Sequence, residues 1–175
     1  GGGSEGHFKH MQEGRFFAGL TNTNGGGFSS IRTKALQLDL SSHAGIRLRV
    51  KGDGRRYTWR LTTEARWRGR EVAYWADFET EKGAWRTVDI PFSRFVPKFR
   101  GFELEGPALD PARITGMGLM IYDNQDGPFE LRLASVYAYS APPSFSLSDY
   151  RGERRVLVVS GPSRDDMDLS QQLGR

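Results

Sequence analysis

The sequence predicts an all-β protein, an antiparallel β-sandwich or jelly roll. Apolar and polar residues alternate with a period of two along most of the chain, which is typical of strands with one buried face. The 175 residues include 22 glycines and 8 prolines, which suits a turn-rich chain. Turn signals recur about every 8–12 residues, the spacing of sandwiches and barrels. No segment before residue 140 shows a clear helical pattern.

Each predicted strand is a short alternating run between clusters of glycine, asparagine, aspartate or proline, the residues that favour turns. Residues 92–101 combine aromatic and basic side chains with Pro97, and we interpret them as a packed loop. A shorter alternation covers residues 36–40. The predicted strands span residues 15–20, 28–32, 46–51, 56–62, 71–80, 85–91, 114–122 and 127–139.

The clearest alternation begins at residue 46, where three aliphatic residues alternate with three cations. The Asp53-Gly54 pair that follows favours a tight β-hairpin. Residues 46–60 contain six basic residues and one acidic residue. Because like charges on adjoining strands repel each other, we expect acids or a ligand to neutralise this face. A hairpin closed at residues 53–54 places four arginines on that face: Arg47, Arg49, Arg56 and Arg60.

We expect two tryptophans, Trp75 and Trp85, to share this cationic surface. Tryptophan rings stack on sugars or bases, and guanidinium groups bind carboxylates, phosphates or hydroxyls. The alternative is that residues 92–102 cover the surface and that acids pair with its arginines. The predicted ligand- or partner-binding site therefore consists of Arg47, Arg49, Arg56, Arg60, Trp75 and Trp85.

No group of residues indicates catalysis, and we expect a protein that is not an enzyme. The chain lacks cysteine, which excludes thiol nucleophiles and thiolate metal sites. Residues 2–6 match G-x-S-x-G, but a nucleophile elbow needs a preceding strand. Asp123, Asn124 and Asp126 fit either a hard cation or ordinary turn chemistry. We expect no metal and no cofactor.

The charge and hydropathy of the chain also restrict its partners. The net charge is +4, which is mild, and we expect no nucleic-acid partner. Apolar runs of about 18 residues, which could span a bilayer, are absent from the sequence, so no transmembrane segment is expected.

The pattern changes after residue 140. The Ala141-Pro142-Pro143 run predicts a linker over residues 141–153. Residues 155–160 form a continuous apolar run of the parallel-sheet kind, and Ser163 with the acids after it predicts the start of a helix. We expect residues 154–175 to begin a second, βα domain that is truncated here.

Several segments of residues 1–140 resemble the complex I intermediate-associated protein 30 family. The segments are NGGGFSSIR (24–32), GIRLRVKGDGRRYTWRLTT (45–63), WRTVDIPFSRFVPKFRG (85–101) and LDPARITGMGLMIYDNQDGPFELRLASVYAY (109–139). The resemblance implies a galactose-binding-like β-sandwich over residues 1–140, N-terminally incomplete, with no catalytic residues to carry over.

The resemblance also implies a function. In mitochondria the family includes an assembly chaperone for respiratory complex I. We therefore expect a non-enzymatic module for protein–protein contact, whose partner is an assembly intermediate of a membrane complex. The alternative is a carbohydrate-binding module with a glycan partner. The expected compartment is the cytoplasm for a bacterial protein and the mitochondrial matrix for a eukaryotic one.

Overall fold

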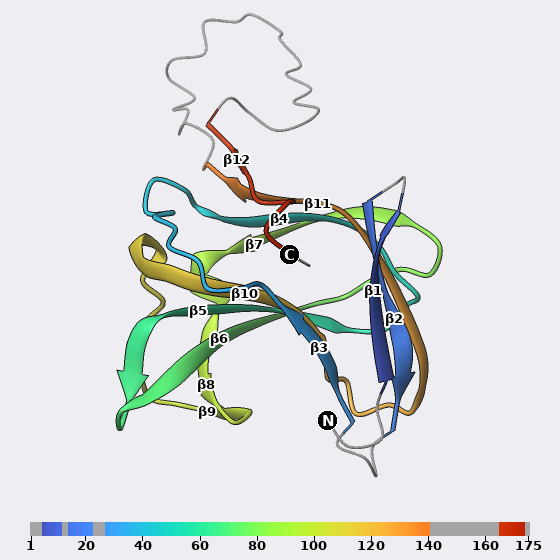
Figure 1. Cartoon of the computed structure of the whole chain (residues 1–175), viewed down its shortest axis with the longest axis horizontal. Helices are drawn as coiled ribbons and strands as arrows, with labels where there is room; N and C mark the ends of the chain where they lie inside the picture. The colour runs from blue at the N-terminus through green and yellow to red at the C-terminus, as the bar shows by residue number, and fades with distance from the viewer. Residues whose placement is uncertain (1–4, 12–13, 23–26, 141–164, 174–175) are drawn as a thin grey trace, which may run out of the picture.

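The computed structural model describes residues 5–11, 14–22, 27–140 and 165–173. Two antiparallel sheets pack face to face, as Figure 1 shows, and the predicted all-β sandwich is confirmed. Sheet A has the order β1-β2-β11-β4-β7, with β12 paired to β11, and sheet B has the order β3-β10-β5-β6-β8-β9.

The strands of sheet A are β1 (Glu5–Met11), β2 (Gly14–Thr21), β4 (Gly45–Lys51), β7 (Trp85–Pro91), β11 (Gly127–Tyr139) and β12 (Met167–Asp168). The strands of sheet B are β3 (Ser29–Arg32), β5 (Tyr57–Trp67), β6 (Arg70–Phe78), β8 (Val96–Phe99), β9 (Phe102–Glu103) and β10 (Ile114–Ile121). Two short 3-10 helices, η2 (Phe92–Arg94) and η3 (Pro111–Arg113), precede β8 and β10.

The core lies between the sheets and is built from the inward half of each alternation. Ile46, Leu48 and Val50 of β4 are buried there, opposite Trp59 and Leu61 of β5. Burial of one such side chain stabilises the fold by about 1.5–3 kcal/mol. The other residues of each strand point outward and form the outer faces of the two sheets.

The predicted hairpin of residues 46–60 is wrong. Strand β4 pairs with β11 and β7, whereas β5 pairs with β10 and β6. The chain does turn at Gly54, whose φ is +91°, but the turn carries it from sheet A to sheet B. Alternation shows which face of a strand is buried. It does not show whether two consecutive strands pair within one sheet or pack against each other from opposite sheets.

An ionic cluster around Arg55, which we call the crossover cluster, anchors this passage between the sheets. The Arg55 guanidinium donates to both carboxylate oxygens of Asp123, at 2.7 and 2.8 Å. Asp53 accepts from the Tyr57 hydroxyl at 3.1 Å and from the Glu130 backbone N–H at 2.7 Å. The remaining acceptors of Arg55 are the Thr21 hydroxyl and the carbonyl oxygens of Gln125, Gly127 and Pro128, at 2.7–3.1 Å.

Residues 92–101, predicted to be a packed loop, instead form η2 and β8. Strand β8 pairs with β6 and β9 and extends sheet B at one edge. Pro97 removes one backbone donor, but its carbonyl accepts from the Leu104 N–H at 3.0 Å, so a four-residue strand tolerates it. The segment widens the outer face of sheet B and does not cover the outer face of sheet A.

The described part of the C-terminal segment, residues 165–173, packs on the sandwich. Strand β12 pairs with β11 through Tyr137↔Asp168 and Ala138↔Met167, and Leu169 and Leu173 are buried in the core. The helix predicted after Ser163 is not formed by these residues, which make a short strand and a turn. The predicted linker and the strand at residues 155–160 lie outside the described residues, and a second domain stays a prediction. No helix within the described ranges has the length and apolarity to cross a bilayer.

Candidate functional site

The structure divides the six predicted site residues between two surfaces. Arg47, Arg49 and Trp85 lie on sheet A, on β4 and β7. Arg60 and Trp75 are cross-strand partners in sheet B, and Arg56 lies just before β5. The single cationic face predicted for four arginines is therefore wrong, because β4 and β5 belong to different sheets.

On sheet A, Arg47 and Arg49 form hydrogen bonds and ring contacts with other residues of the chain. Arg47 donates to both carboxylate oxygens of Asp89 at 2.7 and 3.1 Å and to Asp166 at 3.1 Å, and its guanidinium lies 4.9 Å from the centre of the Tyr139 ring. The hydrogen bonds to Asp89 raise the pKa of Arg47 further above its ordinary value, against the effect of its burial. Arg49 lies 5.9 Å from the centre of the Trp85 ring and donates to Thr87 at 3.1 Å. This surface ties β4, β7 and the C-terminal segment together.

On sheet B, the predicted residues lie beside a groove of about 410 Å³ that opens on the outer face of the sheet, and we call it the sheet B groove. Its lining includes two aromatic rings, three cations and two acids. These residues are Trp75, Tyr122, Arg56, Arg94, Lys98, Asp77 and Glu103. Both charge signs next to exposed aromatic surface are typical of binding sites rather than of a plain solvated face.

The aromatic pair forms the centre of the groove. The rings of Trp75 and Tyr122 meet edge to face, with centroids 6.2 Å apart and planes at 71°. The Lys98 ammonium group lies 5.7 Å from the centre of the Trp75 ring. The indole N–H of Trp75 is buried and donates to no acceptor among the described residues. An unsatisfied buried donor costs about 1–3 kcal/mol, and because the indole N–H of Trp59 in the core is in the same state, this group by itself does not indicate a ligand.

Charged residues hold the groove wall in place. Asp77 accepts a hydrogen bond from the Thr58 hydroxyl at 2.7 Å, and its backbone carbonyl accepts from Arg94 at 2.7 Å. The Arg56 guanidinium lies 3.8 Å from the Asp77 carboxylate and donates to the Tyr122 carbonyl at 3.3 Å. A second hollow, of about 830 Å³, shares Arg56, Asp77 and Arg94 and extends to β7. The groove is therefore part of a longer surface along one edge of the sandwich.

Arg60 lies next to the groove without lining it. Its side chain is 11% exposed and lies 3.6 Å from Glu71. Burial, together with the nearby charge of Arg32, lowers the pKa of Arg60 below its ordinary value. The predicted site thus contributes Trp75 and Arg56 to the groove directly and Arg60 from beside it.

Sequence reasoning did not place Tyr122, Lys98 and Arg94 in the site. Lys98 and Arg94 belong to the aromatic and basic segment that was noted, but their position depends on β8 joining sheet B. Tyr122 follows β10 directly and reaches the groove because β10 neighbours β5. A correct assignment of strand order would have found all three residues.

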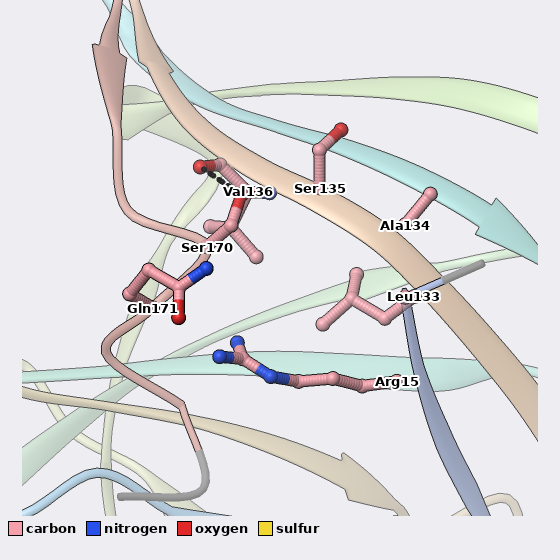
Figure 2. Close-up of a pocket in the computed structure, with 8 residues that line it drawn as sticks. Arg15, Leu133, Ala134, Ser135, Val136, Ser170 and Gln171 are labelled. Carbon is pink, nitrogen blue, oxygen red and sulfur yellow. Dashed lines mark hydrogen bonds between the residues drawn. The ribbon is translucent and has the colours of Figure 1, made fainter. Parts of the chain in front are cut away.

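A smaller pocket, of about 150 Å³, lies between β2, β11 and the C-terminal segment. Figure 2 shows the buried Arg15 side chain extending toward Gln171, with Ser170 hydrogen bonded to Val136. None of the six predicted residues lines this pocket. Its walls are the contacts that fix residues 165–173 on the sandwich, so we interpret it as part of the packing.

Comparison with known proteins identifies both a family and a fold. Residues 1–133 match the family model "Complex I intermediate-associated protein 30 (CIA30)". An uncharacterized protein of Schizosaccharomyces pombe is 32% identical over 78% of this chain and 69% of its own length. The mitochondrial complex I intermediate-associated protein 30 of Mus musculus is 30% identical over 62% of this chain and 34% of its own length.

Solved structures share the sandwich. A family 11 carbohydrate-binding module from Clostridium thermocellum, in complex with a β-1,3-1,4-mixed-linked tetrasaccharide, aligns with a TM-score of 0.53 at 18% identity, over 76% of this chain and 82% of the module. An agarase aligns with a TM-score of 0.58 at 11% identity, over 79% of this chain and 22% of the enzyme. These likenesses show a galactose-binding-like jelly-roll fold.

Proposed function

Because the chain belongs to the complex I intermediate-associated protein 30 family, we propose that it is a non-enzymatic module that contacts a protein partner during the assembly of a membrane complex. The sheet B groove is the contact site. The match covers about a third of the mouse relative, and we propose that this chain shares the assembly role of that whole protein. The proposed compartment is the mitochondrial matrix if the protein is eukaryotic and the cytoplasm if it is bacterial.

The Trp75–Tyr122 ring pair, placed among side chains of both charge signs in the groove, carries this proposal. A polypeptide segment offers apolar side chains that can contact these rings. It can also carry acids for Arg56 and Arg94 and a base for Glu103 on the same short stretch. Aromatic and arginine side chains are the types that dominate binding energy at protein interfaces.

Photo-crosslinking tests the contact. A benzophenone amino acid at Tyr122 should crosslink a subunit or assembly factor of the complex in intact organelles or cells. The same probe at Glu130, exposed on β11 of sheet A and outside both hollows, is the matched control. Crosslinks from Glu130 alone, or equally from both positions, would remove the groove from the proposal.

The substitution Trp75→Phe gives a second measurement. It replaces the indole by a smaller ring and removes part of the aromatic contact surface of the groove, so we expect the crosslink yield from Tyr122 to fall about fivefold, which corresponds to about 1 kcal/mol. Trp85→Phe, in sheet A, is the control and should leave the yield unchanged. A native thermal transition in both variants shows that the change lies in binding.

A glycan is the second candidate ligand. The Trp75–Tyr122 pair in an open groove favours it, because sugar rings stack on aromatic side chains, and a module with this fold has been solved with a tetrasaccharide. The Lys98 ammonium group over the Trp75 ring favours the protein partner instead. Titration with mixed-linked β-glucan oligosaccharides, read by tryptophan fluorescence, separates the two. A response that Trp75→Phe abolishes would support the glycan, and a flat response would exclude these sugars.

A further inference from the structure

Two neighbouring turns at one end of sheet B form a surface that the sheet B groove does not explain. We call residues 66–70 and 98–102 the basic-aromatic tip. These ten residues comprise five cations, three aromatic residues and two glycines, and the acids Glu71 and Glu103, which follow the two turns directly, lie across from Arg66 and Lys98. Trp67 of the first turn lies against Phe99 of the second, with ring centroids 5.3 Å apart, so the turns form one surface. Figure 1 shows the β5–β6 turn at the lower left of the molecule, with β8 and β9 close by.

Aromatic rings, rather than acids, contact three arginines of the tip, whereas Arg66 donates to the carbonyl oxygens of Thr63 and Ala65. The guanidinium of Arg68 lies 4.6 Å from the centre of the Trp67 ring, and those of Arg70 and Arg100 lie 5.5 and 5.4 Å from the centre of the Phe99 ring. These three arginines are exposed, and none of them forms an ion pair within the described part of the chain. Three neighbouring positive charges that form no ion pair in these ranges point to a partner that is anionic.

The backbone of the tip places Arg68 and Arg100 at the first position of two-residue hairpin loops, between the paired residues Trp67↔Arg70 and Phe99↔Phe102. Arg68 and Arg100 have φ values of +50° and +49°, and each precedes a glycine that also has a positive φ. Only one other non-glycine residue in the described ranges has a positive φ, and that residue is Asn124. Asparagine and glycine tolerate this conformation better than arginine does. Two-residue hairpin loops of this kind require a positive φ at both central residues, so the turn sets this conformation, and asparagine would fit it at least as well as arginine.

The apolar residues of the tip decide which anionic partner fits. Phe102 is 75% exposed, the largest value among the large hydrophobic side chains of the described residues. A phenylalanine that projects beside arginines suits the boundary between lipid headgroups and acyl chains. The rings of Trp67 and Phe99 contact each other and the guanidinium groups, so they offer poor platforms for nucleic-acid bases, which bind by stacking.

We propose that the basic-aromatic tip binds the surface of a membrane that contains anionic phospholipids. Arg68, Arg70 and Arg100 contact the lipid phosphates, and Phe102 enters the headgroup region. Attraction between basic residues and anionic lipids falls with distance over about one Debye length, so these projecting turns are well placed to use it. This surface adjoins the sheet B groove at Lys98 and Gly101, and its proposed partner does not depend on what the groove binds.

The test is sedimentation of the protein with phosphatidylcholine vesicles prepared with and without phosphatidylglycerol. We expect binding only to the anionic vesicles and weaker binding as salt increases. The double substitution Arg68→Asn/Arg100→Asn should weaken this binding about 25-fold, about fivefold for each arginine. Its thermal midpoint should stay equal or rise, because asparagine suits the positive φ. Phe102→Ser should weaken binding without changing the salt dependence.

The matched control is Arg49→Gln/Arg86→Gln on sheet A, which removes the same net charge from another surface. We expect it to weaken vesicle binding less than twofold. Equal losses in the two double variants would show that only net charge matters and would overturn the proposal. Failure to bind anionic vesicles at low salt would overturn it as well. So would tighter binding to a single-stranded oligonucleotide or to polyglutamate than to the vesicles.

Discussion

The outer faces of both sheets carry arginine and tryptophan side chains, but these side chains differ in how many contacts they make within the chain. On sheet A, Arg47 contacts Asp89, Asp166 and Tyr139, and Arg49 contacts Trp85 and Thr87, so the arginines join elements of one chain. On sheet B, Trp75 and Tyr122 line an open groove, and Arg68, Arg70 and Arg100 of the basic-aromatic tip form no ion pair in the described ranges. The comparison teaches that residue type alone does not distinguish structural arginines from binding arginines. The number of internal partners does.

The largest expected effect concerns the crossover cluster, which assigns β4 and β5 to different sheets. Arg55→Ala removes six hydrogen bonds and leaves Asp123, whose side chain is 2% exposed, without its cation. We expect the free energy of unfolding to fall by about 3–5 kcal/mol, the usual result of breaking a buried ion pair. Urea unfolding measures this. Arg86→Ala, at an exposed pair, is the control, and an equal small loss in both variants would contradict a special role for Arg55.

The next effect tests the comparison directly. Arg47→Gln takes the guanidinium from Asp166, a carboxylate that is 2% exposed, and should cost about 2 kcal/mol of stability. Arg56→Gln, in the sheet B groove, breaks only exposed contacts, to Asp77 at 3.8 Å and to the Tyr122 carbonyl at 3.3 Å, and should cost less than about 0.5 kcal/mol. Crosslinking from Tyr122 should show the reverse order, with a loss only in Arg56→Gln. If both variants lose stability equally, the two faces do not differ as described.

The smallest effect is a dependence on pH. Burial by itself would raise the pKa of Asp123, but the hydrogen bonds from Arg55 and from the Gln125 N–H hold this pKa below its ordinary value of 3.8. The stability that this carboxylate contributes is therefore fully present above the unfolded-state pKa of about 3.9 and is lost as the pH falls through the lower folded-state pKa.

The difference in unfolding free energy between the unmodified chain and Asp123→Asn should accordingly stay constant from pH 7 to about pH 5 and narrow below about pH 4. Urea unfolding at a series of pH values measures it. A difference that widens as the solution is acidified would show that Asp123 does not have a lowered pKa.

The sequence was sufficient for the fold class and for most strands, because each buried face follows from simple alternation. It was not sufficient for strand order. The Asp53-Gly54 turn has the composition of a hairpin, and only the contacts of Arg55 with the β10–β11 turn and of Asp53 with β11 show where it leads. Because of this error, Arg56 and Arg60 were predicted to lie beside Arg47 and Arg49. In the structure these two pairs belong to different sheets, so the predicted site is divided into two halves.

The groove residues illustrate a second limit. Trp75 was found because an outward tryptophan is conspicuous in any alternating strand. Lys98 was not, because Pro97 argues locally against a strand, and the pairing of β8 with β6 outweighs that local preference. Leu169 and Leu173 were also missed as core residues, because two leucines in a short polar tail have no pattern that shows the distant strand on which they pack.

The pairing of β12 with β11 brings together two points that are distant in the sequence, Ser140 and Asp165. Ser140 donates its N–H to Asp166 at 2.9 Å, and its hydroxyl contacts the Asp165 carbonyl at 3.3 Å, so the two junctions of residues 141–164 adjoin each other. Because the chain leaves the sandwich at Ser140 and returns to it at Asp165, the pairing of β11 with β12 holds both of these points in place.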